Sequence, residues 1–213
     1  MIVANLKQIK SDVPAAVTVV AVSKTKPVDA IQQAYNAGHL DFGENKVQEL
    51  CQKQETLPKD IRWHMIGHLQ RNKVKYIAPF VHLIHGVDSE RLLNEINKQG
   101  AKNNRIIDVL LQIHIAEEST KFGFSYEEAE AILSKANAFE NVRITGLMGM
   151  ASYTDNNGQL TSEFSGLQDF YIKLKESNNW TTLSMGMSND YKLAVSLGST
   201  MIRVGSLIFG SRN

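Results

Sequence analysis

Short runs of apolar residues, many of them β-branched, recur along the chain, and each is followed by a segment with the signals of a helix. Several runs are apolar at successive positions rather than alternating, which is typical of strands buried on both faces of a parallel sheet. The predicted strands span residues 17–22, 40–42, 61–66, 81–87, 106–115, 142–150, 181–185 and 201–204.

Amphipathic helices are predicted in the segments between these runs. Pro27 stands where the first turn of a helix tolerates proline, and Ile31 and Ala34 then share one apolar face. Ser125 and Glu128 have the spacing of a capping box ahead of another apolar stripe. A further helix is expected within residues 1–10, before the first strand.

A strand followed by a helix, repeated eight times, predicts an α/β fold in which a single (β/α)8 barrel uses residues 1–213. No linker, low-complexity segment or charge run indicates a second domain. An open, doubly wound sheet is the alternative, because the number of strands does not by itself prove that the sheet closes.

Composition and charge narrow the class of protein. The chain has 213 residues, of which 43% are hydrophobic and 21% charged, as in an ordinary soluble domain. With 23 Lys and Arg against 22 Asp and Glu, the chain lacks a global field that would attract nucleic acid or an anionic membrane. The apolar runs are too short to span a bilayer, and the lone Cys51 excludes an internal disulfide. We therefore expect a cytoplasmic monomer that binds neither nucleic acid nor membrane.

Lys24 lies two residues after the first predicted strand. In a (β/α)8 barrel the functional groups lie at the carboxyl ends of the strands, so this lysine would point into the mouth of the barrel. Apolar walls there would lower its pKa, and a neutral amine can condense with an aldehyde to form a Schiff base. The alternative is that Lys24 and Lys26 are solvated loop charges.

The segments after the seventh and eighth predicted strands both combine glycine with serine. Ser188 follows Gly186, and Ser206 follows Gly205. Glycine allows close approach of the backbone, and a following helix N-terminus offers unpaired N–H groups, so both segments suit an anion such as phosphate. Each serine could also be a helix N-cap, a role compatible with phosphate binding.

Arg203 lies within the otherwise apolar eighth strand. A buried guanidinium needs an acceptor, and a carboxylate such as Glu44 is one candidate. The other candidate is the pyridine nitrogen of pyridoxal 5′-phosphate (PLP), for which arginine is a known type of partner. Because strands one and eight are neighbours in a closed barrel, Lys24, Arg203 and the two serine segments would surround one point.

These residues and their neighbours resemble the family of pyridoxal phosphate homeostasis proteins. The resemblance rests on AVSKTKP at 21–27, FGEN at 42–45, WHMIGHLQRNK at 63–73, SMGMSND at 184–190 and RVGS at 203–206. It implies a barrel similar to that of alanine racemase, with PLP held as a covalent aldimine on Lys24. It also implies a role in the balance of intracellular PLP and of amino and keto acids.

The resemblance assigns roles to the residues of the expected site. Arg203 would face the pyridine nitrogen, Asn45 would lie near the ring, and Ser188, Gly205 and Ser206 would bind the phosphate. Lys26 and Lys121 match further family lysines near the site, without a defined role.

Two classes of function fit such a site. The first is a protein that carries or buffers PLP and delivers it to apo PLP-dependent enzymes. The second is a PLP-dependent amino-acid racemase or lyase. Alanine racemases add a β-domain, and a tyrosine from the partner subunit acts on the opposite ring face, whereas only residues 207–213 follow the eighth predicted strand. The sequence therefore favours the carrier.

The histidines do not predict a metal site. His82 and His85 are three residues apart on a predicted strand, so their side chains would face opposite sides. His64 and His68 straddle the end of another strand, where no helix brings them together. His64 is instead expected inside the barrel.

Overall fold

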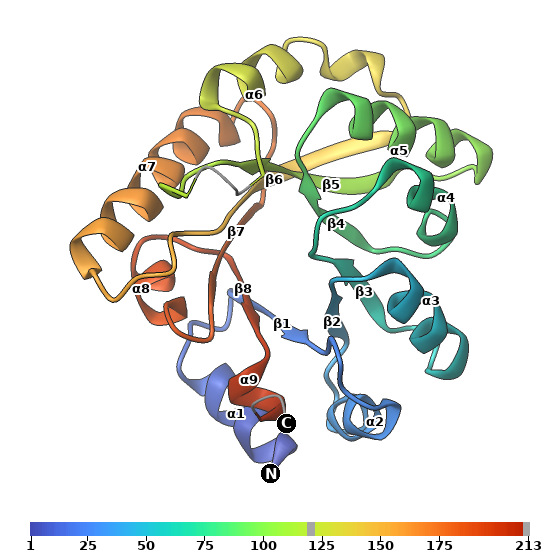
Figure 1. Ribbon diagram of the computed structural model, residues 1–213, viewed down its shortest axis with the longest axis vertical. Helices are drawn as coiled ribbons and strands as arrows, with labels where there is room; N and C mark the ends of the chain where they lie inside the picture. The colour runs from blue at the N-terminus through green and yellow to red at the C-terminus, as the bar shows by residue number, and fades with distance from the viewer. Residues whose placement is uncertain (119–121, 211–213) are drawn as a thin grey trace.

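The computed structural model describes residues 1–118 and 122–210, and the sheet it contains is a closed barrel. Each strand pairs in parallel with the next, and β8 closes the ring by pairing with β1 (Figure 1). The strands are β1 (Thr18–Val22), β2 (Asp41–Glu44), β3 (Arg62–Met65), β4 (Leu83–Val87), β5 (Ile107–Ile113), β6 (Val142–Gly149), β7 (Thr182–Met187) and β8 (Met201–Val204). The predicted barrel is confirmed, and the open sheet is excluded.

The helices surround this ring of strands in Figure 1. They are α1 (Ile2–Ser11), α2 (Val28–Asn36), α3 (Val47–Thr56), α4 (Val74–Ile77), α5 (Glu90–Lys102), α6 (Tyr126–Leu133), α7 (Asn157–Lys175), α8 (Tyr191–Ser196) and α9 (Ser206–Phe209). Two short 3₁₀ helices, η1 (Arg71–Lys73) and η2 (Ala136–Ala138), complete the set within the described residues. Among these helices none is long and apolar enough to cross a membrane.

Local sequence signals account for several element boundaries. Ser125 caps α6 in the predicted capping box, with Glu128 closing it from the other side. Pro27 is the N-cap of α2, and Gly38 follows the helix with a φ of 83°. The expected N-terminal helix is α1, where Asn5 donates a hydrogen bond to the carbonyl of Ile208 in α9 at 3.1 Å. This contact brings the two ends of the described chain together (Figure 1).

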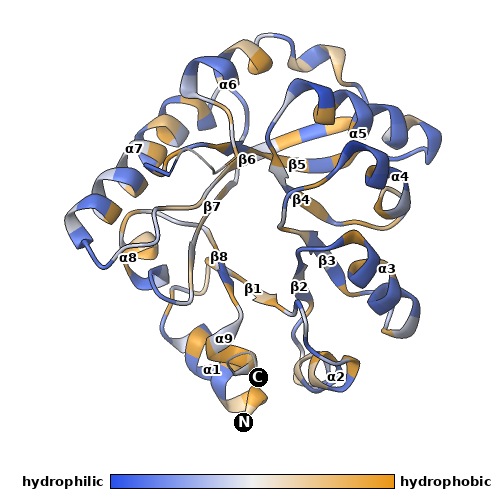
Figure 2. Ribbon diagram, viewed as in Figure 1, coloured by the Kyte–Doolittle hydropathy of each residue, from blue (hydrophilic) through white to orange (hydrophobic). Residues whose placement is uncertain are grey.

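The core has two parts. The larger one lies between the strands and the helices, whose ribbons in Figure 2 alternate between hydrophobic and hydrophilic residues. The smaller one consists of Val20, Leu83, Leu110, Met148 and Met201. These residues come from β1, β4, β5, β6 and β8, so they can meet only inside the closed barrel. The interior also contains buried polar side chains, among them His64, His85, Ser184 and Arg203.

Candidate functional site

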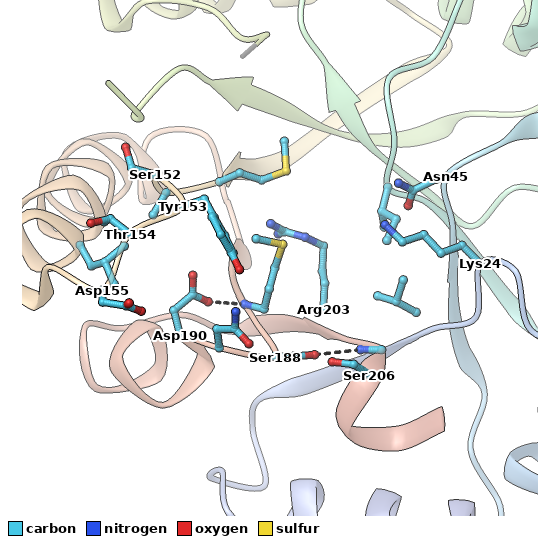
Figure 3. A pocket seen from close by; sticks show the side chains of 18 of the residues that line it. Lys24, Asn45, Ser152, Tyr153, Thr154, Asp155, Ser188, Asp190, Arg203 and Ser206 are labelled. Carbon is cyan, nitrogen blue, oxygen red and sulfur yellow. Dashed lines mark hydrogen bonds between the residues drawn. The ribbon is translucent and has the colours of Figure 1, made fainter. Parts of the chain in front are cut away.

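A pocket of about 660 Å³ opens at the carboxyl ends of the strands, between the loops that follow β1, β2, β6, β7 and β8. Figure 3 shows this pocket from close by, with side chains from all of these loops around it. All six residues expected to bind the cofactor line it, namely Lys24, Asn45, Ser188, Arg203, Gly205 and Ser206. The structure thus brings together residues that are up to 182 positions apart in the sequence, from 24 to 206.

Lys24 lies half-buried in a tight turn directly after β1. The backbone N–H of Lys26 donates to the carbonyl of Ser23 at 3.0 Å, and Thr25 has a φ of 63°. This turn places Lys24 in the pocket wall rather than along the next helix. Lys26 lines the same pocket and its Nζ donates to the carbonyl of Gly210 at 2.9 Å. Lys121 lies outside the described residues.

Arg203 is 3% exposed, and its guanidinium hydrogen-bonds to neutral acceptors. One terminal nitrogen donates to the carbonyl and to Oγ of Ser184 at 2.9 and 2.6 Å, and the other donates to the carbonyl of Gly149 at 3.0 Å. Burial lowers the pKa of Arg203 to about 10, and the negative charge of Asp190 raises it in part. The side chain therefore stays cationic at neutral pH, and an anionic or electron-rich ligand would find a donor here.

The alternative ion pair between Arg203 and Glu44 is wrong. Glu44 is fully buried, and its Oε1 accepts hydrogen bonds from Lys53 Nζ at 2.7 Å and from Ser23 Oγ at 2.6 Å. Burial nevertheless raises the pKa of Glu44, although Lys53 opposes the shift. Lys53 thus takes the partner that the sequence offered to Arg203.

The loops after β7 and β8 touch each other at the base of the pocket. The N–H of Gly205 donates to Ser188 Oγ at 3.3 Å, one of the dashed lines in Figure 3. The helices that follow are N-capped by Asp190 and Gly205, so the reading of Ser188 and Ser206 as N-caps is wrong. Ser206 is exposed and lines the pocket.

Asn45 follows β2 on the same side of the pocket as Lys24 in Figure 3. Its Oδ1 is buried and has no hydrogen-bond partner among the described residues. A buried amide oxygen without a hydrogen-bond partner costs free energy. A ligand that places a hydrogen-bond donor beside this atom would therefore be stabilised here.

The sequence reasoning missed the pocket wall formed by the loop between β6 and α7. Ser152, Tyr153, Thr154 and Asp155 line the pocket across from Lys24 (Figure 3). Ser152 is tied to Glu163 of α7 by two hydrogen bonds of 2.6 Å, from its N–H and its Oγ. The position of this loop after a strand could have predicted that it lines the pocket. Its residues, however, carry no motif for phosphate or Schiff-base chemistry.

The expectation that His82 and His85 face opposite sides of a strand is also wrong. His82 precedes β4 and does not follow its alternation, so both rings lie against His64, with centroid distances of 5.4 and 5.2 Å. Donor atoms of Asp41, His64 and His82 lie within 4.8 Å of one another. Arg62 already holds the Asp41 carboxylate in a two-bond fork.

Comparison with known proteins gives the family. The family described as "Alanine racemase, N-terminal domain" matches residues 1–213. The pyridoxal phosphate homeostasis protein of Aquifex aeolicus is 39% identical over 193 residues, which cover 89% of this chain and 85% of that protein. The chain belongs to the family of pyridoxal phosphate homeostasis proteins.

Solved structures of relatives agree with the barrel. PipY of Synechococcus elongatus, solved without PLP, has a TM-score of 0.94 at 35% identity and covers 99% of this chain and 100% of its own. PipY solved with PLP bound has a TM-score of 0.90. Alanine racemase of Streptomyces lavendulae, at 14% identity and a TM-score of 0.80, shares the fold over 57% of its chain.

Proposed function

We propose that this protein binds PLP in the pocket at the carboxyl ends of the strands and takes part in PLP homeostasis. The observation that carries the proposal is the convergence of a lysine amine, a buried guanidinium and two hydroxyl-bearing loops on one cavity. The names of its relatives, and the PLP-bound structure of PipY, support the same ligand.

The chemistry of the donor set fits PLP. The pocket volume of about 660 Å³ falls within the usual range for cofactor sites, roughly 300–1,000 Å³. Arg203 provides a buried cation whose acceptors within the protein are neutral, and Asn45 provides an amide oxygen that lacks a partner among the described residues. A polar ring that offers an acceptor to Arg203 and a hydrogen-bond donor to Asn45 would compensate both groups.

Each residue then has a role that its position allows. Lys24 supplies the amine for covalent attachment, Ser188, Gly205 and Ser206 hold the phosphate, Asn45 meets a polar ring substituent, and Arg203 faces the pyridine nitrogen. When bound, PLP supplies an aldehyde that condenses with an amine, with loss of water, and a ring that withdraws electrons. Because Arg203 remains protonated, it donates to the nitrogen without giving up its proton, which limits how strongly the ring withdraws electrons.

The carrier function is the one we favour over a racemase or lyase. A guanidinium at the ring nitrogen suits holding the cofactor better than stabilising carbanions. The expected recipients are apo PLP-dependent enzymes, and the protein is expected to act as a monomer in the cytoplasm.

Borohydride reduction of the protein loaded with PLP, followed by peptide mapping, tests the attachment site. The reagent should fix the cofactor on Lys24, and Lys24→Ala should abolish the label. Lys26→Ala is the matched control, since Lys26 lines the same pocket, and it should keep the label. Label on Lys26 in the wild-type protein, or an unchanged yield in Lys24→Ala, would contradict the assignment of Lys24.

A further inference from the structure

A chain of hydrogen-bonded side chains crosses the interior of the barrel from β8 to β2. Arg203 donates to Ser184 Oγ at 2.6 Å, Ser184 Oγ lies 3.0 Å from His85 Nδ1, and His85 Nε2 lies 2.9 Å from His64 Nδ1. His64 Nε2 completes the chain at 3.1 Å from Asp41 Oδ1. All five residues are buried, with exposed fractions between 0 and 7%. We call this chain the interior relay.

The two ends of the interior relay are chemically fixed. Arg203 can only donate hydrogen bonds. At the other end, hydrogen bonds from His64 and Arg62 hold the pKa of the Asp41 carboxyl well below its usual range, although burial opposes them. Asp41 is therefore ionised and can only accept. With both histidines neutral, each of the three intervening groups can accept one hydrogen bond and donate one, and the protons then all point from Arg203 toward Asp41.

The proton positions follow one by one from this constraint. Among the described residues, Ser184 Oγ has two partners, Arg203 and His85; Arg203 can only donate, so in this arrangement the Ser184 proton goes to His85 Nδ1. Burial, with a smaller contribution from the positive charge of Arg203, lowers the pKa of His85 well below its ordinary value. The neutral His85 then carries its proton on Nε2 and donates it to His64 Nδ1. When His64 is neutral as well, its proton lies on Nε2, from which it is donated to Asp41.

We propose that His85 and His64 are positioning residues that orient the Ser184 hydroxyl and, through it, hold the Arg203 guanidinium at the wall of the ligand pocket. With its proton directed to His85, Ser184 presents a lone pair to Arg203. Loss of His85 frees the hydroxyl to rotate, and the guanidinium loses the shorter of its two bonds to Ser184. The link between Arg203 and PLP rests on the proposed function, whereas the proton arrangement is a property of the ligand-free chain.

The first test is an NMR measurement on the ligand-free protein. Long-range ¹H–¹⁵N correlation spectra distinguish the two neutral tautomers of histidine, and His64→Asn and His85→Asn assign the signals. Both rings should be protonated at Nε2 and unprotonated at Nδ1. Ser184→Ala should shift the Nδ1 resonance of His85, because it removes the hydroxyl donor. A proton on Nδ1 of either histidine would overturn the proposal.

The second test measures PLP affinity in matched variants. His85→Leu should weaken equilibrium binding about tenfold or more, the usual cost of one charge-assisted hydrogen bond, and shift the visible absorption of the bound cofactor. His85→Asn places an amide oxygen where Nδ1 stood and should restore most of the affinity. His82→Leu is the control: its ring also lies against His64 but takes no part in the relay, so it should bind PLP like the wild type.

The outcomes separate this proposal from the proposed function. A wild-type protein that does not bind PLP would remove the function but leave the NMR result to decide the relay. Wild-type affinity in a folded His85→Leu variant would remove the positioning role. Should His85→Leu fail to fold, Ser184→Ala and Ser184→Thr repeat the comparison, because threonine retains the hydroxyl and alanine does not. Equal affinity in these two variants would likewise overturn the proposal.

Discussion

At the scale of single residues, the pocket depends on which buried charges find partners inside the protein. Glu44 and Lys53 neutralise each other behind the pocket, at 2.7 Å. Arg203, by contrast, is held by two carbonyls and a hydroxyl and keeps its positive charge at the pocket wall. This difference is the reason for assigning Arg203 to the proposed ligand, because a buried cation is stabilised most by an electron-rich partner.

The phosphate assignment predicts the effect of removing single hydroxyls. Ser188→Ala and Ser206→Ala should each weaken PLP binding by roughly 1.5–3 kcal/mol, about tenfold or somewhat more, because each removes one charge-assisted hydrogen bond to a dianion. Equilibrium titration measures the effect, and Ser196→Ala, on the outer helix α8, should be neutral. Pyridoxal without phosphate should bind weakly and respond little to either substitution. An equal loss for both ligands would argue against the anion site.

His39 predicts how stability depends on pH. It is 2% exposed, its Nε2 lies 2.9 Å from the carbonyl of Asp41, and burial lowers its pKa to about 4. Between pH 4 and the unfolded value of about 6.5, the unfolded chain binds a proton that the folded chain does not. The free energy of unfolding should therefore fall by up to about 3 kcal/mol as the pH drops through this window.

Urea unfolding at several pH values, compared with His39→Gln, measures this dependence. Glutamine cannot titrate but can still donate to the carbonyl, so the variant should lose part of the slope between pH 4 and 6.5. A slope that this substitution leaves unchanged would show that His39 is not the group responsible.

At the scale of elements, the loop between β7 and α8 places Ser188. Gly186 has a φ of 95°, and a Cβ there would come within 2.7 Å of Ala194 Cβ and 3.0 Å of Tyr191 Cα. The strand can therefore pack directly against its own following helix only if this position is glycine. Ser188, two residues later, reaches the N–H of Gly205 because of that close packing.

Gly186→Ala and Gly38→Ala separate backbone strain from this packing. Both glycines have positive φ, so each substitution should destabilise the protein by about 1–2 kcal/mol. An added Cβ at Gly38 meets nothing within 4 Å, whereas at Gly186 overpacking adds roughly 1–3 kcal/mol more. Only Gly186→Ala should also weaken PLP binding, because it displaces Ser188. Equal unfolding free energies and equal PLP affinities in the two variants would contradict this account.

At the scale of the whole molecule, closure of the barrel decides where the chemistry lies. The pairing of β8 with β1 aligns Val20 with Arg203, which brings the two ends of the sequence to one side of the pocket. Lys24 follows β1, while Gly205 and Ser206 follow β8, so the proposed attachment residue and the proposed phosphate loop meet only because the ring closes. An open sheet of the same strands would leave them at opposite edges.

The carrier function predicts the behaviour of the loaded protein toward amino acids. Incubation with alanine or serine should give racemisation or elimination near the background of free PLP, because Arg203, in its proposed place at the pyridine nitrogen, would leave the ring a weak electron sink. Transfer of PLP to an apo PLP-dependent enzyme should proceed, and it should fail in Lys24→Ala for lack of stable loading. Turnover of about 1 s⁻¹ or faster, as in typical enzymes, that disappears in Lys24→Ala would instead establish the racemase or lyase alternative.

The sequence by itself determined the order of the elements and the residues at the strand ends. Hydrophobic periodicity and capping are local properties, so all eight strands were predicted, although β7 runs to Met187 rather than to residue 185. Lys24, Asn45 and the two serine loops could be found because strand ends are visible in the pattern and the family resemblance supplied their roles.

Only the tertiary structure decided which buried polar groups pair. Lys53, not Arg203, meets Glu44, and His64 and His85 join Ser184 and Asp41 across the barrel. The residues of this interior relay lie on β2, β3, β4, β7 and β8, and their spacing in the sequence carries no signal that they touch. The physical reason is that strand alternation tells which side chains point inward, but barrel closure and the register between strands determine which of them lie within hydrogen-bond distance.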